Sequence, residues 1–247
     1  MCGCENMRSL LKIFGSSRIT DLTRRMEFGM PTYPTHPKFF QMRWCSMGDP
    51  AEMNQLVLGE HSGTHVDAPS HFVREGDPAR KNIDEVPIDQ FIGRAVKLCF
   101  GPFPANNIQV TAEDIRAWEA AHIPIEERDI VLFDFGWGDK WATGEAGFDF
   151  LDSWPGLSRS AAEYLAEKHV KLVGTDCISL DPGDGGDDLA AHLTLLPRGI
   201  LILENVCNLS QIETESFFMA LPLNVAGGTG APVRAISVQS SAADETS

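Results

Sequence analysis

The chain has 247 residues, of which 43% are hydrophobic and 22% are charged, a composition usual for a globular protein. Its formal net charge is −15. This argues against a nucleic-acid partner, because phosphate binding needs clustered lysine and arginine. No apolar run reaches the roughly 18 residues that a membrane-spanning helix needs, so no membrane partner is expected either.

Residues 1–18 contain one apolar patch, LLKIF at residues 10–14. This patch is shorter than the apolar region of a signal peptide, so we expect a cytoplasmic protein. We interpret residues 1–18 as a tail that is flexible or lies at an interface, and residues 19–247 as a single domain. The part of that domain before about residue 95 is rich in turn residues, which predicts hairpins and loops.

The cysteines match no disulfide framework. Three of them lie within apolar runs and are predicted to be buried thiols, which fits a reducing compartment. Cys2 and Cys4 could touch a metal, but two ligands on a mobile terminus make a poor site. The predicted buried thiols are Cys99, Cys177 and Cys207, and the sixth cysteine is Cys45.

Short apolar runs bounded by glycine, proline or aspartate recur along the chain. Their content of valine, isoleucine, leucine and phenylalanine predicts largely buried strands. The predicted strands lie at residues 95–100, 129–135, 170–176, 200–206 and 232–238.

Helical patterns lie between some of these runs. Residues 111–123 begin at Thr111, and residues 158–170 begin at Ser158, both of which are good N-caps. The side chains predicted to share one face are Ile115, Trp118 and Ala121 in the first helix, and Ala162, Leu165 and His169 in the second.

A shorter helix is predicted within residues 187–199, stopping near Pro197. Strands therefore alternate with helices over the later part of the chain. This alternation predicts an α/β domain.

The segment GEHSGTHVDAPSHF, residues 59–72, holds three of the chain's seven histidines. His61, His65 and Asp67 lie close together, and Gly63 makes a long regular helix unfavourable there. Two imidazoles and one carboxylate are a common ligand set for divalent Zn, Mn or Fe. The segment therefore predicts a metal-binding loop in which these side chains converge.

Other residues of the segment have less certain roles. Thr64 could hydrogen-bond a ligand and fix its orientation. His71 is either a further ligand or a proton shuttle, because the pKa of imidazole is close to working pH. Two other interpretations remain: a polar surface loop without metal, and a metal-free Ser–His–Asp arrangement that uses Ser62 or Ser70. The second lacks the signature of a nucleophile elbow.

Two remote residues could complete the site. Glu204 ends a buried apolar run, where a carboxylate is costly unless it is paired or bound to a cation. His192 lies in the predicted short helix. The alternatives are a strand-end acid that faces water and a histidine on the helix surface or in the core.

Pocket residues are harder to predict. Aromatic side chains often line ligand sites, and Phe39, Phe40 and Trp137 are candidates, although core packing is the favoured role for each of them. Asp176 and Asp181 follow a predicted strand and could shape the site or act as turn and cap residues.

The segment HSGTHVDAPSH resembles the signature of the cyclase-type metal-dependent hydrolases, the family that includes bacterial kynurenine formamidase and isatin hydrolase. The resemblance extends from Ile19 to Val238. DLTRRMEFGMPTYPTHPKF, DFGWGDKW, PGLSRSAAEYL, GTDCISLDP and LPRGILILENVCNL follow in the family's order. The resemblance implies a swivelling β/β/α domain with a mixed β-sheet core and flanking helices, which assembles as a homodimer or homotetramer.

The resemblance also implies a ligand set. His61, His65 and Asp67 match the ligands of a first metal, and Asp67 would bridge to a second metal completed by His192 and Glu204. Family members with glutamine at the position of Glu204, such as isatin hydrolase, bind one manganese. Glutamate at this position implies two ions per chain, zinc or manganese.

His71 matches the histidine that acts as acid or base in this family. The resemblance thus implies a hydrolase that cleaves a small amide, lactam or ester with metal-activated water and a histidine proton shuttle. Its substrate would be a small carbonyl compound. The alternatives are a metal-dependent cyclase or dehydratase on the same scaffold, or a non-catalytic protein that binds metal or a small molecule.

Overall fold

The computed structural model describes residues 2–44, 51–103, 108–183 and 188–240. Its largest sheet has eight strands in the order β1-β12-β11-β5-β7-β9-β10-β4. The bounds of these strands in chain order are β1 (Ser17–Asp21), β4 (His65–Asp67), β5 (Ile92–Cys99), β7 (Ile130–Asp134), β9 (Leu172–Thr175), β10 (Leu201–Glu204), β11 (Glu215–Pro222) and β12 (Gly230–Ser240).

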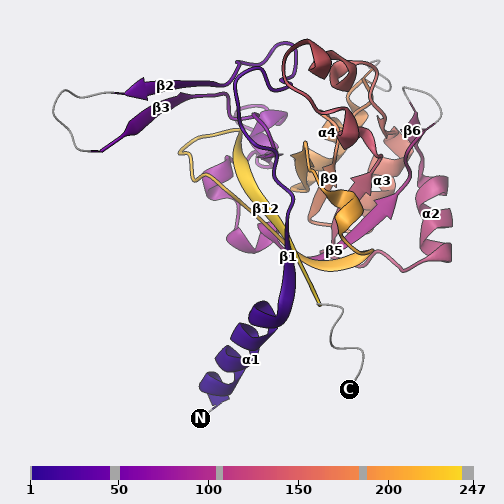
Figure 1. Cartoon of the computed structure of the whole chain (residues 1–247). Coiled ribbons are helices and arrows are strands. Elements are labelled where there is room, and N and C mark those ends of the chain that lie inside the picture. Colours follow the sequence, from indigo (N-terminus) through magenta and orange to yellow (C-terminus); the bar gives the residue numbers. More distant parts are fainter. Residues whose placement is uncertain (1, 45–50, 104–107, 184–187, 241–247) are drawn as a thin grey trace.

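The described residues also form two small sheets and several helices (Figure 1). One small sheet is the hairpin of β2 (Phe40–Trp44) and β3 (Met53–Val57), and the other pairs β6 (Gln109–Val110) with β8 (Gly156–Leu157). The α-helices are α1 (Cys2–Ser16), α2 (Ala112–Ala121), α3 (Arg159–Glu167) and α4 (Ala190–Leu195). The predicted mixed α/β architecture with flanking helices is confirmed.

The large sheet closes on itself through its shortest strand. β4 pairs with β10 on one side and with the first residues of β12 on the other. β1 pairs with the far end of β12. Neighbours among β5, β7, β9 and β10 run parallel, so their carboxyl ends meet at one edge of the sheet. Such edges are where open α/β proteins place their sites.

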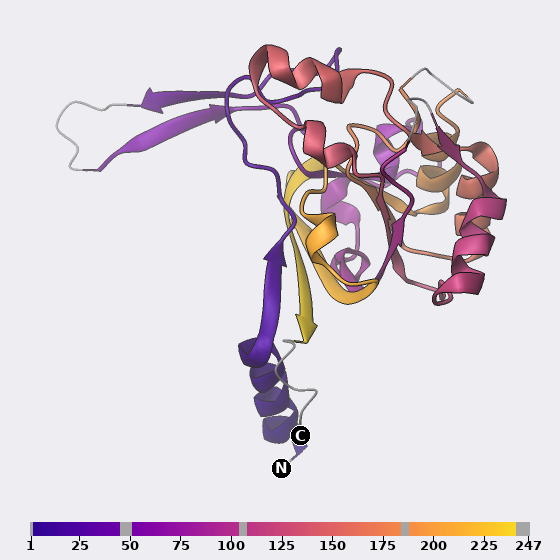
Figure 2. The same cartoon turned by 45° about the vertical axis from the view of Figure 1, so that its right-hand side comes forward.

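Alternation along the strands sends side chains into two separate cores. On β7, Ile130 and Leu132 belong to one cluster, which includes residues of β4, β10, β11 and β12. Val131 and Phe133 belong to a second cluster, built with residues of α2, α3 and α4. Figure 2 shows α2 and α3 outside the sheet on this second face. Burial on both faces explains why these strands are continuous apolar runs.

The two predicted helix starts are confirmed. Thr111 caps α2 and accepts a hydrogen bond from the backbone of Asp114, and Ser158 caps α3 in the same way. Ile115 and Trp118 are buried, but Ala121, the last residue of α2, is exposed. The predicted apolar face is therefore shorter than expected, because the chain leaves the core at the end of this helix.

The predicted end of α3 and the predicted start of α4 were wrong. α3 ends at Glu167, and His169 has a left-handed backbone (φ 55°) that turns the chain toward β9. α4 begins only at Ala190, after Leu189, which is also left-handed (φ 59°). Residue 187, the predicted start, lies outside the described residues. A 3₁₀ turn that contains Pro197 follows α4, as the proline predicted.

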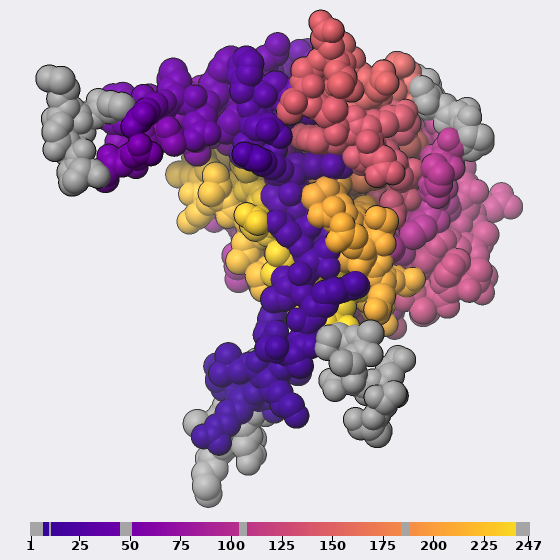
Figure 3. Space-filling model, in the orientation of Figure 1, coloured from indigo at the N-terminus to yellow at the C-terminus, as the bar shows by residue number. Residues whose placement is uncertain are grey.

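Two elements project from the body. In the predicted tail, residues 2–18 form α1 and the start of β1, and α1 extends away from the sheet (Figure 1). The hairpin of β2 and β3 extends in another direction, and all ten of its strand residues are exposed. Figure 3 shows this hairpin clear of the body.

The cysteine predictions were partly wrong. Cys177 and Cys207 are buried free thiols, whereas Cys99 is exposed because it is the last residue of β5, where the strand leaves the core. Cys45 and the side chains of Cys2 and Cys4 lie outside the described residues. Of the helices that the structure describes, none has the length and apolar character needed to cross a membrane.

Candidate metal centre

Strand register brings three predicted ligands together. His65 and Asp67 are two residues apart on β4, so their side chains point to the same face. Val66 between them is fully buried in the core. Glu204 on β10 lies directly opposite His65, and cross-strand partners share a face of the sheet. Side chains from two distant segments therefore converge because of strand pairing alone.

His192 on α4 completes a cluster of alternating imidazoles and carboxylates. His65 Nε2 lies 3.5 Å from Asp67 Oδ1 and 3.4 Å from Glu204 Oε2. His192 Nε2 lies 3.3 Å from Asp67 Oδ2 and 3.4 Å from Glu204 Oε1. These separations exceed the ~2.9–3.0 Å usual for N–H···O hydrogen bonds. They match the roughly 3.4 Å that separates two ligand atoms bound about 2.1 Å from one tetrahedral ion.

The other ring nitrogen of each of these histidines is occupied by a partner. His65 Nδ1 donates to the carbonyl oxygen of Gly63, 2.9 Å away, and this glycine is left-handed (φ 61°). His192 Nδ1 donates to Asp181 Oδ2 at 2.5 Å, and Asp181 also accepts from the backbone of Ala191. Because Nδ1 carries the proton in both rings, each Nε2 can present its lone pair to a cation.

His61 reaches the cluster from the preceding turn. Its Nδ1 lies 2.6 Å from Asp67 Oδ1, and its Nε2 lies 3.0 Å from Thr229 Oγ1. Gly230 allows this approach, because a Cβ there would lie 2.6 Å from both His61 Cε1 and the carbonyl oxygen of Val66. Thr229 and Gly230 were missed in the sequence, since glycine and threonine before a strand give no metal signal.

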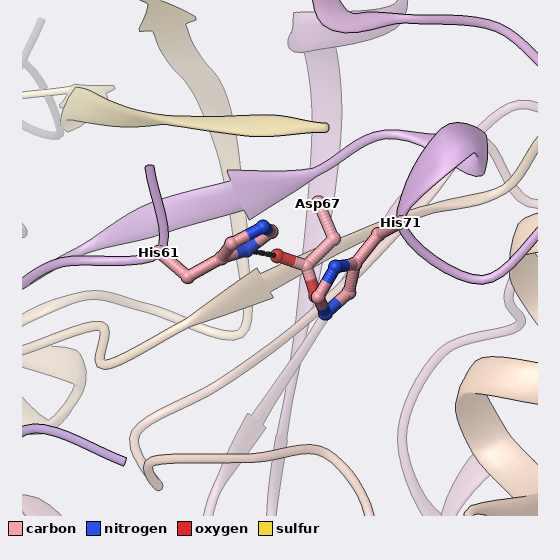
Figure 4. A group of neighbouring side chains, drawn as sticks. All are labelled: His61, Asp67 and His71. Carbon is pink, nitrogen blue, oxygen red and sulfur yellow. Dashed lines mark hydrogen bonds and ion pairs between the residues drawn. The ribbon is translucent and has the colours of Figure 1, made fainter. Parts of the chain in front are cut away.

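His71 lies on the cavity side of His61. It ends a 3₁₀ turn, Pro69–His71, and its ring stacks on His61 with centroids 3.9 Å apart. The candidate ligand atoms of His61, Asp67 and His71 lie within 4.8 Å of one another (Figure 4). Burial lowers the pKa of His71 to about 4, so the ring is neutral near pH 7. Both sequence alternatives, further ligand and proton shuttle, fit this position.

The two carboxylates are buried and ionised. Asp67 is 1% exposed and Glu204 is 5% exposed, so the alternatives of a surface loop and of a strand-end acid in water were wrong. Burial raises the pKa of Asp67, but His61 and His192 outweigh it and hold the pKa well below its usual range. Burial and Asp67 raise the pKa of Glu204, and His192 and His65 again outweigh them.

In the histidines, burial lowers the pKa and the neighbouring carboxylates raise it. Burial lowers the pKa of His65, but Glu204 and Asp67 outweigh it and raise the pKa. Burial also lowers the pKa of His192, and hydrogen bonds to Asp181, Asp67 and Glu204 raise it well above the usual value. The centre therefore attracts positive charge, which protons or a cation can supply. Its nitrogen and oxygen donors fit zinc or manganese.

A cavity of about 280 Å³ opens onto this cluster. Its apolar walls and convergent polar groups are typical of a small-molecule site. The lining residues are Tyr33, His36, His61, His65, His71, Phe72, Ser179, Leu189, His192 and Glu204.

The predicted pocket aromatics are elsewhere. Phe39 is buried and Phe40 is exposed on β2, and neither lines the cavity. Trp137 is buried and donates its Nε1–H to the carbonyl oxygen of Phe150. Tyr33, in the loop PTYPTHP, is an aromatic residue that does line the cavity. Nothing in the sequence distinguished it from the other aromatic residues.

The hydroxyl residues of the histidine loop do not have the roles that were predicted for them. Thr64 binds no side chain of the cluster: it accepts from the backbone of Arg24 and donates to the carbonyl oxygen of Asn205, which fastens the loop to the end of β10. The hydroxyl oxygens of Ser62 and Ser70 are buried without a hydrogen-bond partner in the described part of the chain. The Ser–His pair of the metal-free alternative is therefore missing there.

The two aspartates after β9 have different roles. Asp181 orients His192, as the previous contacts show, so it does shape the site. Asp176 accepts from the backbone N–H groups of Phe135 and Gly138 and stays outside the cavity. Burial raises its pKa to about 6. One was correctly predicted to shape the site, and the other is a loop-fixing residue.

The comparisons with known proteins agree with this geometry. The Cyclase family model, described as "Putative cyclase", matches residues 20–182. An isatin hydrolase of Roseibium aggregatum is 33% identical over 75% of this chain and 74% of its own length. A kynurenine formamidase of Bacillus mycoides is 30% identical over 90% of this chain and 97% of its own. A crystal structure of an isatin hydrolase bound to the product analogue thioisatinate superposes with a TM-score of 0.88, 26% identity, and coverage of 98% and 100%.

Proposed function

The chain belongs to the cyclase family, and we propose that it is a metal-dependent hydrolase that cleaves a small amide, lactam or ester. One observation carries this proposal. The Nε2 atoms of His65 and His192 stand 3.3–3.5 Å from oxygens of two buried carboxylates, Asp67 and Glu204. That spacing suits ligands that share a cation better than it suits hydrogen bonds.

We assign the ligands to two ions. Asp67 Oδ1 faces His61 and His65, and Asp67 Oδ2 faces His192, which lies beside Glu204. Contact on both oxygens supports a carboxylate that bridges the two ions. When bound, divalent zinc or manganese supplies a Lewis acid that activates water and polarises the carbonyl group. The two ions and their identity are part of the proposal, as is His192 as a ligand beside Glu204.

The chain's own groups supply proton transfer and orientation. His71 is neutral near pH 7, so it can take a proton from water and return it to the leaving nitrogen or oxygen. Asp181 holds His192 in the tautomer that faces the cluster. Tyr33, Phe72 and Leu189 form an apolar wall that can hold the ring of an aromatic substrate and exclude bulk water.

The test is hydrolysis by the purified protein. We expect turnover of at least one of N-formylkynurenine, isatin or a small lactone, and loss of turnover on chelation. Turnover should return when zinc or manganese is added back, and elemental analysis should find two ions per chain. Metal binding without hydrolysis of any of these compounds would favour a cyclase or dehydratase.

His71→Ala separates the enzyme from a protein that only binds metal. This variant should keep its metal and lose most of its turnover, because a positioned acid–base contributes roughly 10²–10⁴-fold. Unchanged turnover would refute the role assigned to His71, and loss of the metal would make His71 a ligand instead.

The location of the protein and its assembly are also proposals. Cys99, Cys177 and Cys207 are free thiols, which supports a reducing, cytoplasmic location. We also propose that the chain assembles as a homodimer or homotetramer. The exposed hairpin of β2 and β3 is the feature that supports assembly.

A further inference from the structure

His61 faces the cluster in a different way from the other two histidines. His65 and His192 turn Nε2 toward the carboxylates, and the Nδ1 atom of each donates to an oxygen elsewhere in the chain. In His61 the two nitrogens are exchanged. Its Nδ1 lies 2.6 Å from Asp67 Oδ1, and its Nε2 lies 3.0 Å from the hydroxyl oxygen of Thr229. The partner of Nε2 therefore decides whether Nδ1 can present a lone pair to a cation.

Glu60 fixes the direction of the Thr229 hydroxyl group. Glu60 Oε2 accepts from the backbone N–H of Thr229 at 2.9 Å and from its hydroxyl group at 2.7 Å. A carboxylate accepts hydrogen bonds and donates none, so the single hydroxyl proton points at Glu60. The hydroxyl oxygen has only lone pairs left for His61. His61 Nε2 is therefore the donor in the contact between the ring and Thr229.

A neutral imidazole with its proton on Nε2 has a lone pair on Nδ1. In His61 this lone pair faces Asp67 Oδ1, which also offers only lone pairs. Two such atoms repel each other at 2.6 Å unless a positive charge lies between them. The pair therefore suits a shared cation.

The strand register holds Thr229 in this place. Gly230, the first residue of β12, lies directly opposite Asp67 on β4. The carbonyl oxygen of Thr229 accepts from the backbone N–H of Ala68 at 2.9 Å. The strand pairing that puts Asp67 into the centre thus also puts the Thr229 hydroxyl group behind His61.

We propose that Glu60 and Thr229 are positioning residues that hold His61 in the tautomer protonated at Nε2, so that His61 faces the metal through Nδ1. Neither residue lines the cavity, so both act through His61 and not on the substrate. The negative charge of Glu60, relayed by the hydroxyl group, also makes the imidazole a stronger ligand. This inference rests on the proposed metal centre and assigns the ligand atom of one of its histidines.

The tautomer is the first test, and nitrogen NMR of the zinc-loaded protein measures it. With isotope-labelled histidine, His61 should carry a proton on Nε2 and zinc on Nδ1, whereas His65 and His192 should show the reverse. Comparison with His61→Gln assigns the signals of His61. A proton on Nδ1 of His61 would overturn this inference and leave the proposed hydrolase standing.

The same measurement separates this inference from the proposed function. It needs no substrate, so a protein that shows the expected tautomers but cleaves nothing would support the inference and contradict the proposed hydrolysis. A protein that binds no zinc would overturn both.

Removal of the hydroxyl group is the second test. Thr229→Val keeps the shape of the side chain but leaves His61 Nε2 without its acceptor, whereas Thr229→Ser keeps the hydroxyl group. Titration against a competing chelator should show that Thr229→Val binds one of the two zinc ions roughly 10–100-fold more weakly, the usual effect of losing such a contact. Thr229→Ser should bind both ions like the unmodified protein.

The two-ion readout distinguishes positioning from a merely structural role. The ion next to His61 should be weakened and the other should not, because Thr229 contacts no other histidine ring of the described cluster. Equal weakening of both ions, equal weakening by Thr229→Ser, or unchanged affinity in Thr229→Val would overturn the role of Thr229.

Glu60 is tested with a control that removes the same charge. Glu60→Gln can turn its amide N–H toward Thr229, and the hydroxyl group is then free to donate to His61 Nε2. Glu85→Gln changes a carboxylate that accepts from the backbone N–H of Asn82 in a nearby turn. We expect weaker binding of one zinc ion for Glu60→Gln and unchanged binding for Glu85→Gln. Equal zinc affinities for these two variants would overturn the role of Glu60.

Discussion

The histidine loop and the β2–β3 ribbon are neighbours in the sequence, but they hold their side chains in opposite ways. In the loop, His65 has a partner on each ring nitrogen and Asp67 faces three imidazoles. In the ribbon, all ten strand side chains are exposed. The loop is fixed by the chain's own contacts, whereas the side chains of the ribbon are left exposed by the described part of the chain and are free for the proposed assembly. Substitutions should therefore affect folding and metal binding in the first region and association in the second.

The largest effect on folding should come from substitution of Asp176, a buried acid outside the histidine loop. Asp176 and Asp67 are both buried, but the pKa of Asp67 is lowered while burial raises the pKa of Asp176 to about 6. The folded state therefore binds more protons than the unfolded state between about pH 4 and 6. The contribution of Asp176 to the free energy of unfolding is favourable below that window and falls as the pH rises through it.

Asp176→Asn removes this dependence. Relative to the unmodified protein, the variant should gain roughly 2.5 kcal/mol in free energy of unfolding as the pH rises from 4 to 7, since one pKa unit corresponds to about 1.4 kcal/mol and the unfolded carboxyl is already partly ionised at pH 4. Urea unfolding of both proteins at several pH values measures the difference, in which all other titrating groups cancel. A difference that stays constant over this range would contradict the raised pKa.

A smaller effect is expected from the residue that orients a proposed ligand. Asp181→Asn weakens the hydrogen bond to His192 Nδ1 and frees the ring to adopt the other tautomer. Loss of such an outer contact lowers metal affinity by roughly 10–100-fold. Titration against a competing chelator measures this change. The exposed Asp152 provides the control Asp152→Asn, which should bind metal like the unmodified protein.

Much of the site could be predicted from the sequence because its chemistry is carried by rare residue types. His61, His65 and Asp67 are close in sequence, and Glu204 interrupts an apolar run where only pairing or a cation justifies a carboxylate. Thr229 and Gly230 could not be found, because their roles depend on backbone proximity that only the closed sheet creates. The strands were predicted well because both of their faces are buried. The end of α3 before His169 and the start of α4 after Leu189 were not, because they depend on left-handed backbone conformations.

The ribbon was predicted only as part of a region of hairpins, and its role was not. Its alternation of apolar and polar residues indicates a half-buried strand, but the described part of the chain leaves that apolar half exposed. Sequence patterns report that a side chain should be buried without saying which molecule buries it. The two regions differ mainly in this respect: the chain itself buries the side chains of the histidine loop, but it leaves those of the ribbon exposed.

The smallest effect on folding is expected from substitutions in the exposed ribbon. Leu56→Ser lies on the polar face of the ribbon and should change the free energy of unfolding of the body by no more than about 0.5 kcal/mol, as exposed substitutions usually do. Met53→Ser should do the same at dilutions where the protein is monomeric, but at higher concentration it should lower the apparent stability, because dimer formation stabilises the folded state by mass action. Unfolding measured over a range of protein concentrations tests both. A loss of stability for Met53→Ser that does not depend on concentration would mean that the side of the hairpin that carries Met53 and Trp44 packs on its own body. The two regions would then be fixed in the same way.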